Sequence, residues 1–336
     1  MRTPFYLLVT AALVSVPPPA PKFVGVSGNQ FTLGGHSFKP LALNDCVLRG
    51  RVGGPGAGPT LVFGMDGGFR SRGEPENFVD ATTYFRAYRD AGFNIFRLGV
   101  CGAGVGNDEA LLDEAIDRAR ENGFAVWLVV FQGPLPDARS ARLKARHAAE
   151  RYAGRVDLWE ITNEEWPDLY ALSEAISELR AADPYDHPVT STWTSPAIAD
   201  HLDFISPHYY TDDGSGAIER AVSEARVLAG RKPILFGELG RFTVNWGPDQ
   251  ASLLGAWFKT AERLGVYLGL WNTGNIKDYF GPGSSNTYLG PEERALLARL
   301  TSSAPTPTPP PRTVPGVAPA ASSSAGCGNW WRPCPR

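Results

Sequence analysis

Two glutamates that each end a short apolar run could together do hydrolytic chemistry. Glu164 follows the run LWEITN, and Glu238 follows the run PILFG. A carboxylic acid can protonate a leaving oxygen while a second carboxylate attacks carbon or activates water, and this pair of roles cleaves glycosidic bonds. A separation of about 5–5.5 Å between two such carboxyls predicts retention of configuration, whereas a wider gap predicts inversion.

Polar and aromatic side chains also end other apolar runs of the chain. Besides the two glutamates, these residues are Asn44, Arg97, Asn163, Trp193, His208, Tyr210 and Trp271. Glu160 stands four residues before Glu164, and we expect its side chain to point into the fold as a structural group. These residues could act together where a fold brings the ends of separate strands to one place.

The chain repeats one pattern eight times between residues 21 and 300: an apolar run, a polar stretch and a helical period. The predicted strands span 40–44, 94–99, 125–131, 158–163, 189–193, 204–208, 233–238 and 266–271. The predicted helices span 78–91, 108–122, 138–152, 168–182, 195–201, 216–229, 249–264 and 291–300. A β-hairpin with a Gly34-Gly35 turn is predicted before the first of these strands.

This alternation predicts an α/β fold, a (β/α)8 TIM barrel with an N-terminal β-hairpin and a disordered Pro/Thr/Ser-rich C-terminal tail. Runs such as VWLVVF and PILF suit a parallel sheet that is buried on both faces. The alternative is a doubly wound open sheet, but no G-x-G-x-x-G motif follows the first strand, and RGRVGGPGAG favours a flexible loop. In a TIM barrel the carboxyl ends of the strands form the active site.

The two ends of the chain differ in composition from the predicted barrel, 22–300. Residues 1–21 combine Arg2, a short apolar run and prolines, which predicts a secretory signal peptide, with an uncleaved membrane anchor as the alternative. Residues 301–326 read as a Pro/Ser/Thr-rich linker, and 327–336 as a short Cys/Trp tail. We therefore expect a secreted protein with no membrane attachment after signal cleavage.

Charge and cysteine usage exclude several classes of function. The chain of 336 residues has a net charge of −3, so we expect no nucleic-acid partner. Cysteines stand at 46, 101, 327 and 334; a local Cys327–Cys334 disulfide is expected, and Cys46–Cys101 requires neighbouring strands at 44 and 99. Because there is no C-x-x-C motif and the five histidines are scattered, we expect no metal and no cofactor.

Several motifs carry a resemblance to clan A glycoside hydrolases, family 5 especially. WEITNEEW (159–166) looks like the strand-four motif of the clan, and FGELG (236–240) resembles the strand-seven nucleophile motif. NIFRLGV (94–100) and SPHYY (206–210) are similar to the arginine and His-x-Tyr motifs, and 22–44 resembles the start of family 5 endo-β-mannanases. The resemblance covers roughly residues 22–300, and its motifs stand in the family's order.

The resemblance implies a double-displacement mechanism with retention. Glu164 would be general acid and then general base, with a carboxyl kept protonated near neutral pH by burial and by the second carboxylate. Glu238 would be the nucleophile, held ionised by Arg97 and contacted by Tyr210. His208 would orient the site or tune Glu164.

The remaining predicted site residues would bind sugar. Asn163 would bond the 2-hydroxyl, Trp271 would form the floor of the reacting subsite, and Asn44 would contact substrate. Trp166, Trp193 and Trp246 would stack on pyranose rings. Two positions depart from the family pattern: Glu165 stands where proline usually follows the acid, and Gln132 where strand three usually ends in histidine.

The function predicted from these residues is cleavage of β-1,4-linked mannan or glucan by a monomeric enzyme of the endo-β-1,4-mannanase or cellulase type. An exo-acting β-mannosidase or β-glucosidase is the alternative within the same class. The alternative from another class is a non-catalytic carbohydrate-binding barrel. Binding alone would need no paired acid and nucleophile, which favours the enzyme.

Overall fold

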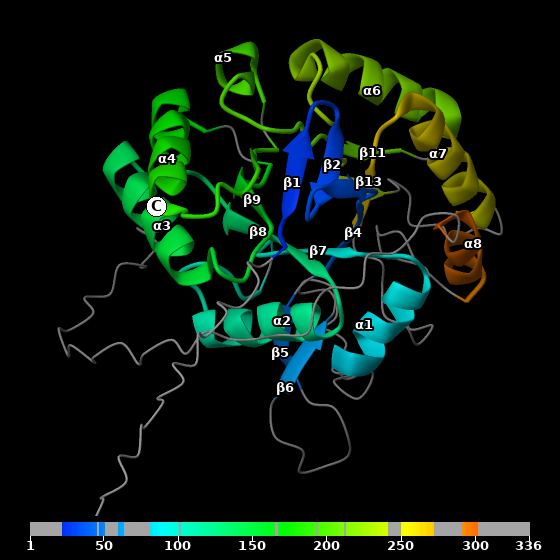
Figure 1. The fold of residues 1–336 in the computed structure, drawn as a ribbon, viewed down its shortest axis with the longest axis horizontal. Helices are drawn as coiled ribbons and strands as arrows, with labels where there is room; N and C mark the ends of the chain where they lie inside the picture. Colours follow the sequence, from blue (N-terminus) through cyan, green and yellow to red (C-terminus); the bar gives the residue numbers. More distant parts are fainter. Residues whose placement is uncertain are drawn as a thin grey trace, which may run out of the picture. The chain divides into compact units, whose positions relative to one another are not determined.

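Eight parallel strands form the central sheet of the computed structural model (Figure 1), in the order β10-β9-β8-β7-β4-β13-β12-β11. The strands are β4 (Leu41–Asn44), β7 (Ile95–Leu98), β8 (Ala125–Phe131), β9 (Leu158–Thr162), β10 (Val189–Thr190), β11 (His208–Tyr210), β12 (Glu238–Gly240) and β13 (Leu268–Trp271). Asp203 N donates to Val189 O (2.9 Å), so the chain that leads into β11 lies beside β10 and brings the two edges together. The predicted TIM barrel is confirmed.

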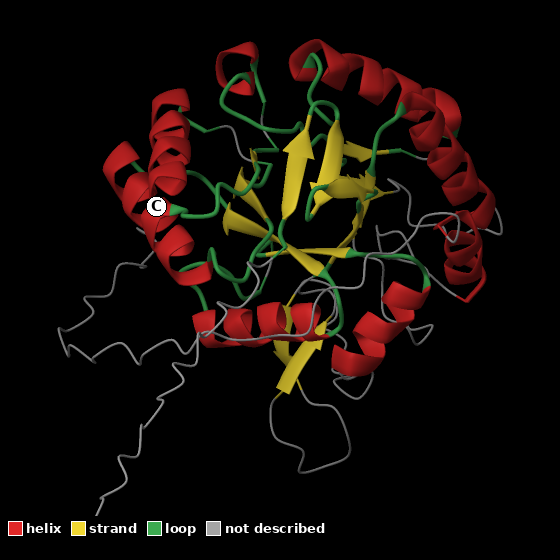
Figure 2. Cartoon of the chain, in the orientation of Figure 1, coloured by secondary structure: helices red, strands yellow, loops and turns green. Residues whose placement is uncertain are grey.

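Helices surround this sheet on its outer side, as Figure 2 shows in red. They are α1 (Ala81–Asp90), α2 (Glu109–Glu121), α3 (Ala138–Tyr152), α4 (Leu169–Ala182), α5 (Pro196–Ala199), α6 (Ser215–Ala229), α7 (Gln250–Leu264) and α8 (Pro291–Thr301). Each amphipathic helix turns one apolar face to the strands; in α3 this face is made of small residues and ends at Tyr152. Aspartate side chains cap the starts of α2, α3 and α4: Asp108 accepts from Leu111 N, Asp137 from Ser140 N and Asp168 from Ala171 N.

A three-stranded antiparallel sheet precedes the barrel and covers the amino ends of its strands. It consists of β1 (Val24–Ser27), β2 (Gln30–Leu33) and β3 (His36–Phe38), with Gly34 and Gly35 at positive φ in the predicted turn. The Phe31 ring lies 5.3 Å from the Phe204 ring and packs beneath the barrel among residues of the central strands. A second antiparallel pair, β5 (Val47–Gly50) and β6 (Thr60–Phe63), flanks the Gly-rich stretch.

The regular ladders of two strands begin later than the sequence predicts. Strands were expected at 204–208 and 233–238, but the ladder between β11 and β12 starts at the His208–Glu238 pair. Before it, the chain makes only isolated bridges, such as Ile205 with Ile234. Pro207 and Pro233 have no N–H to donate, so a continuous ladder does not form there.

The structure describes residues 22–45, 47–50, 60–63, 81–100, 102–164, 167–192, 194–211, 213–240, 250–271 and 291–301, all within one compact unit. The predicted signal segment, the predicted tail and all four cysteines lie outside the described residues. Of the predicted linker, only Thr301 is described, and it ends α8. Among the described residues, no helix has the length and apolar character needed to cross a membrane.

Candidate active site

Six strands of the central sheet, β4, β7, β9, β11, β12 and β13, bring most of the predicted site residues together. Asn44 ends β4 and is paired in register with Arg97 of β7 and with Trp271 of β13. His208 begins β11 opposite Glu238, the first residue of β12. Asn163 and Glu164 follow β9 directly. This is the end of the barrel where residues from separate strands converge on one site.

Arg97 is the fully buried hub of the site. Its Nε donates to Glu160 Oε2 (2.7 Å), and Nη2 donates to Glu160 Oε1 (2.7 Å) and Asn163 Oδ1 (2.7 Å). Its Nη1 donates to Asn44 Oδ1 (2.9 Å) and Glu238 Oε1 (2.8 Å). All five N–H groups of the guanidinium are therefore used. Burial alone would lower the pKa of Arg97, but the ion pairs with Glu160 and Glu238 outweigh it and raise that pKa.

Asn44 fixes the orientation of its own amide through the barrel backbone. Its Nδ2 donates to Gly237 O (2.7 Å) and to Leu270 O (3.2 Å), so the oxygen must face Arg97. The side chain is fully buried. In this structure Asn44 therefore ties β4 to β12 and β13 and holds the guanidinium. The predicted contact with substrate does not follow, because both ends of the amide are already bonded within the protein.

Glu238 accepts hydrogen bonds on both carboxyl oxygens. Arg97 Nη1 donates to Oε1, and the Tyr210 hydroxyl donates to Oε2. A group that only accepts is a carboxylate, which is the form a nucleophile requires. Burial and the nearby charge of Glu238 raise the pKa of Tyr210, so its hydroxyl keeps the proton that it donates.

Glu164 has a different environment from Glu238. Its side chain is 49% exposed, whereas that of Glu238 is 3% exposed. Its backbone has a positive φ of 55°, a conformation that a non-glycine residue adopts only when the surrounding chain enforces it. This turn at the end of β9 directs the carboxyl to His208, whose Nδ1 lies 2.8 Å from Oε1.

The expected upward shift of the Glu164 pKa is wrong for this arrangement. The hydrogen bond with His208 lowers the pKa of Glu164, burial opposes it, and the charges of His208 and Arg97 lower it further. Because half of the side chain is exposed, burial is the weaker influence. A proton source for the first chemical step must therefore include His208 as well as Glu164.

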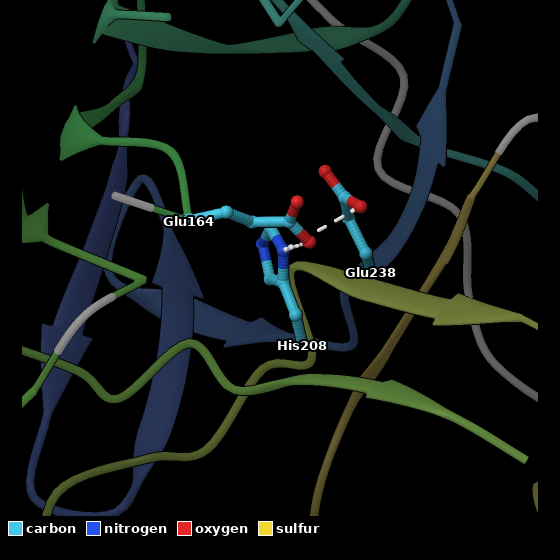
Figure 3. A group of neighbouring side chains, drawn as sticks. All are labelled: Glu164, His208 and Glu238. Atoms are coloured by element: carbon cyan, nitrogen blue, oxygen red, sulfur yellow. Dashed lines mark hydrogen bonds and ion pairs between the residues drawn. The ribbon is translucent and has the colours of Figure 1, made fainter. Parts of the chain in front are cut away.

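Glu164 and Glu238 face each other with His208 beside both of them, as Figure 3 shows. One oxygen of each carboxyl and Nδ1 of His208 all lie within 4.8 Å of one another. His208 Nδ1 is 3.4 Å from Glu238 Oε2. Two carboxylates and one imidazole at this spacing could also ligate a metal ion, but Arg97 already offsets the charge of Glu238, and Tyr210 donates to its other oxygen.

Two residues of the site were not singled out as functional from the sequence. Glu160 is fully buried and holds Arg97 through both carboxyl oxygens, in the structural position expected for it. Thr192, just beyond β10, donates its hydroxyl proton to Glu160 Oε1 and lies 3.1 Å from His208 Nε2. Its signal in the sequence was only its place in TSTW at the end of a predicted strand.

The tryptophans of the site are described only in part. Trp271 ends β13 beside Asn44 and is partly exposed, as an apolar floor would require. Trp166, Trp193 and Trp246 lie outside the described residues, so their predicted stacking on sugar stays a prediction. The same holds for Glu165.

Solved structures share this fold at low sequence identity. A β-glucanase from Saccharophagus degradans aligns with a TM-score of 0.56 and 17% identity, over 87% of this chain and 99% of its own. An endo-1,4-β-mannanase from Rhizomucor miehei gives a TM-score of 0.54 and 14% identity, over 84% and 99%. A β-glucuronidase from Ruminococcus gnavus gives 0.53 and 16%, over 84% and 51%. No protein-family model and no curated protein matches the sequence.

Proposed function

We propose that this protein is a retaining glycoside hydrolase of the clan A, family 5 type that cleaves β-1,4-linked mannan or glucan. The observation that carries the proposal is the pair of carboxyls, Glu164 and Glu238, with oxygens within 4.8 Å of each other. This spacing fits the separation of about 5–5.5 Å in retaining enzymes better than the separation of about 6.5–9.5 Å in inverting enzymes. The glycanases among the similar folds support the same class of substrate.

In the first step Glu238 acts as the nucleophile. Its carboxylate attacks the anomeric carbon while a proton from the Glu164–His208 pair passes to the glycosidic oxygen through Glu164. The carbon–oxygen bond to the leaving sugar breaks, and a glycosyl ester of Glu238 forms. Arg97 and Tyr210 orient the attacking carboxylate, since each donates to one of its oxygens.

In the second step Glu164 acts as a base. A water molecule attacks the anomeric carbon from the side that the leaving sugar vacated, and its proton returns to Glu164. The ester bond to Glu238 breaks, so the carboxylate is regenerated and the product keeps its configuration. The exposed position of Glu164 suits both the departing sugar and the entering water.

The N-terminal segment supports a further part of the proposal, namely that the enzyme is exported. Residues 1–21 have the composition of a signal peptide. An extracellular location suits a polymeric substrate that cannot enter a cell. Detection of the mature chain in culture medium would test this, and retention of the full chain inside cells would contradict it.

A reducing-sugar screen tests the proposed activity. The chain is assayed on glucomannan, galactomannan, carboxymethylcellulose, laminarin and xylan. We expect release from a β-1,4-mannan or β-1,4-glucan, and ¹H NMR should show the β-anomer appearing first. Absence of release from all five polymers, or first appearance of the α-anomer, would overturn the proposal.

A further inference from the structure

A series of contacting side chains lies behind the imidazole of His208. His208 Nε2 lies 3.1 Å from Thr192 Oγ1 and 3.3 Å from Arg97 Nη2. Thr192 in turn contacts Glu160 Oε1, and both oxygens of Glu160 are held by Arg97. On its other edge, His208 Nδ1 faces Glu164 Oε1 at 2.8 Å.

The number of available protons limits the hydrogen bonds among Arg97, Glu160, Thr192 and His208. Arg97 Nη2 can only donate in its 3.3 Å contact with His208 Nε2, but both of its protons already go to closer acceptors on Glu160 and Asn163 at 2.7 Å, so the contact with Nε2 is a shared and weaker one. The single hydroxyl proton of Thr192 goes to the Glu160 carboxylate, which has no proton of its own to give. Thr192 Oγ1 therefore meets Nε2 only as an acceptor, and Nε2 must be protonated.

We propose that Thr192 and Glu160 are positioning residues that keep the ring proton of His208 on Nε2, so that Nδ1 and Glu164 share the proton delivered to the leaving oxygen. This inference rests on the proposed glycosidase function. With Nε2 protonated, a neutral ring presents a lone pair at Nδ1, and the contact at 2.8 Å requires one proton between Nδ1 and Glu164. That proton lies either on the carboxyl or on the imidazole.

Keeping Nε2 protonated raises the proton affinity of the Glu164–His208 pair. If the pair lost its shared proton, the Nδ1 lone pair would face the Glu164 carboxylate at close range, which is repulsive. If the ring proton moved to Nδ1 instead, it would stabilise that carboxylate, and the acid would lose its proton at lower pH. The positioning chain therefore extends the pH range over which the acid is loaded.

Several other charged groups face His208. They are Glu160 from β9, Glu164 beyond β9, Glu238 from β12 and Arg97 from β7. Tyr210 on the same strand donates to Glu238 and stays neutral. The His208 ring packs closely against the backbone of Gly237, where even a Cβ would lie 2.6 Å from Nε2. The ring therefore has little freedom to rotate.

A pH profile of kcat/KM for Thr192→Val tests the proposal. Valine has nearly the shape of threonine but has no hydroxyl, so the neutral ring is free to place its proton on Nδ1. We expect the alkaline limb of the profile to move by about one pH unit towards acid, with the acidic limb in place. Thr192→Ser keeps a hydroxyl and should restore the alkaline limb.

Thr190→Val is the matched control for this experiment. Thr190 lies two residues earlier on β10, is fully buried, and donates its hydroxyl proton to Phe204 O at 2.9 Å, away from His208. Its loss should lower stability without moving either limb of the profile. An alkaline limb that is the same in Thr192→Val, Thr190→Val and the unmodified chain would overturn the proposal.

¹⁵N NMR of the histidine rings reports the proton without any assay of activity. The chain has five histidines, and His208→Asn assigns the signal. On the alkaline side we expect Nε2 protonated and Nδ1 bare in the unmodified chain, and the reverse in Thr192→Val. On the alkaline side, a neutral ring of the unmodified chain with its proton on Nδ1 and a bare Nε2 would refute the inference. If no glycan is cleaved, the proposed function fails by itself, and the ring signals still decide where the proton lies.

Discussion

The two ends of the barrel both bury carboxylates, but they bind them in different ways. At the amino end, Asp157 accepts from Val24 N (3.2 Å), Val126 N (2.9 Å) and Arg120 Nη1 (2.9 Å). At the carboxyl end, the donors to Glu238 among the described residues are the side chains of Arg97 and Tyr210, and Glu164 contacts His208 Nδ1. Two of the three donors to Asp157 are backbone N–H groups, whereas the donors to Glu238 are side chains.

This difference separates carboxylates that hold the fold together from those that could react. A backbone N–H in a strand cannot move without breaking the sheet, so Asp157 is fixed in one state and joins the hairpin sheet to the barrel. Side-chain donors turn or exchange partners at a lower cost, so Glu164 and Glu238 could bond to substrate in place of protein. The comparison predicts that the two ends respond differently to loss of a charge.

Removal of the Glu238 charge should have the largest effect on activity. Glu238→Gln keeps the shape of the side chain but removes the nucleophile, so we expect kcat to fall by about 10³-fold or more. The melting temperature should stay within a few degrees of the unmodified chain. Reducing-sugar release and circular dichroism measure the two quantities.

A matched control for Glu238→Gln is Glu224→Gln, which changes an exposed glutamate on α6. That variant should retain full turnover. Turnover by Glu238→Gln at the level of the control would remove Glu238 from the mechanism.

Replacement of Arg97 should affect both stability and activity, since this residue is structural and belongs to the site. Lysine has three donors and no planar fork, so Arg97→Lys leaves acceptors on Glu160 and Asn163 without partners. We expect the free energy of unfolding to fall by about 3 kcal/mol and kcat/KM to fall by about 100-fold. Urea unfolding and steady-state kinetics check both, and a change in only one would show that the two roles are separable.

Loss of the Asp157 charge should lower stability but leave the chemistry intact. In Asp157→Asn one oxygen is replaced by an amide, so at least one of the three donors loses its acceptor. We expect about 2 kcal/mol less free energy of unfolding and an unchanged kcat for the folded fraction. A large loss of kcat would contradict the division between the two ends.

Asp183, also at the amino end, should give stability a dependence on acid pH. Burial would raise the pKa of Asp183, but hydrogen bonds from His187, Tyr185 N and Trp159 outweigh it and lower that pKa below its ordinary value of 3.8. A carboxylate of this kind stabilises the fold fully above the ordinary value, and its contribution is lost as pH falls through the lowered one. The gap in unfolding free energy between the chain and Asp183→Asn should therefore narrow below about pH 4. A gap that is constant from pH 7 to pH 3 would refute this.

The barrel and the place of its site are predictable from the sequence because both follow from periodicity. Apolar runs alternate with helical patterns, and the residue that ends each parallel run must lie at one end of the barrel. Asn44, Arg97, His208 and Glu238 are found there for this reason. Strand boundaries near Pro207 were less predictable, because isolated bridges replace a regular ladder there.

The electrostatics of the site could not be read from the sequence in the same way. Thr192 looks like any β-strand threonine until its hydroxyl is placed between Glu160 and His208. The lowered pKa of Glu164 depends on the hydrogen bond between its carboxyl and His208. The positive φ of Glu164 directs the side chain to that contact, and the sequence does not reveal this backbone conformation. Contacts between side chains from separate strands require the tertiary structure.

The positive φ of Glu164 places function and stability in opposition at a single residue. Glycine would occupy this turn without the penalty of roughly 1 kcal/mol or more that a side chain brings in the left-handed region. Random mutation followed by selection for thermal tolerance alone should therefore favour loss of this glutamate. Selection for turnover would keep an acidic side chain at this strained position, whereas selection for stability alone would not.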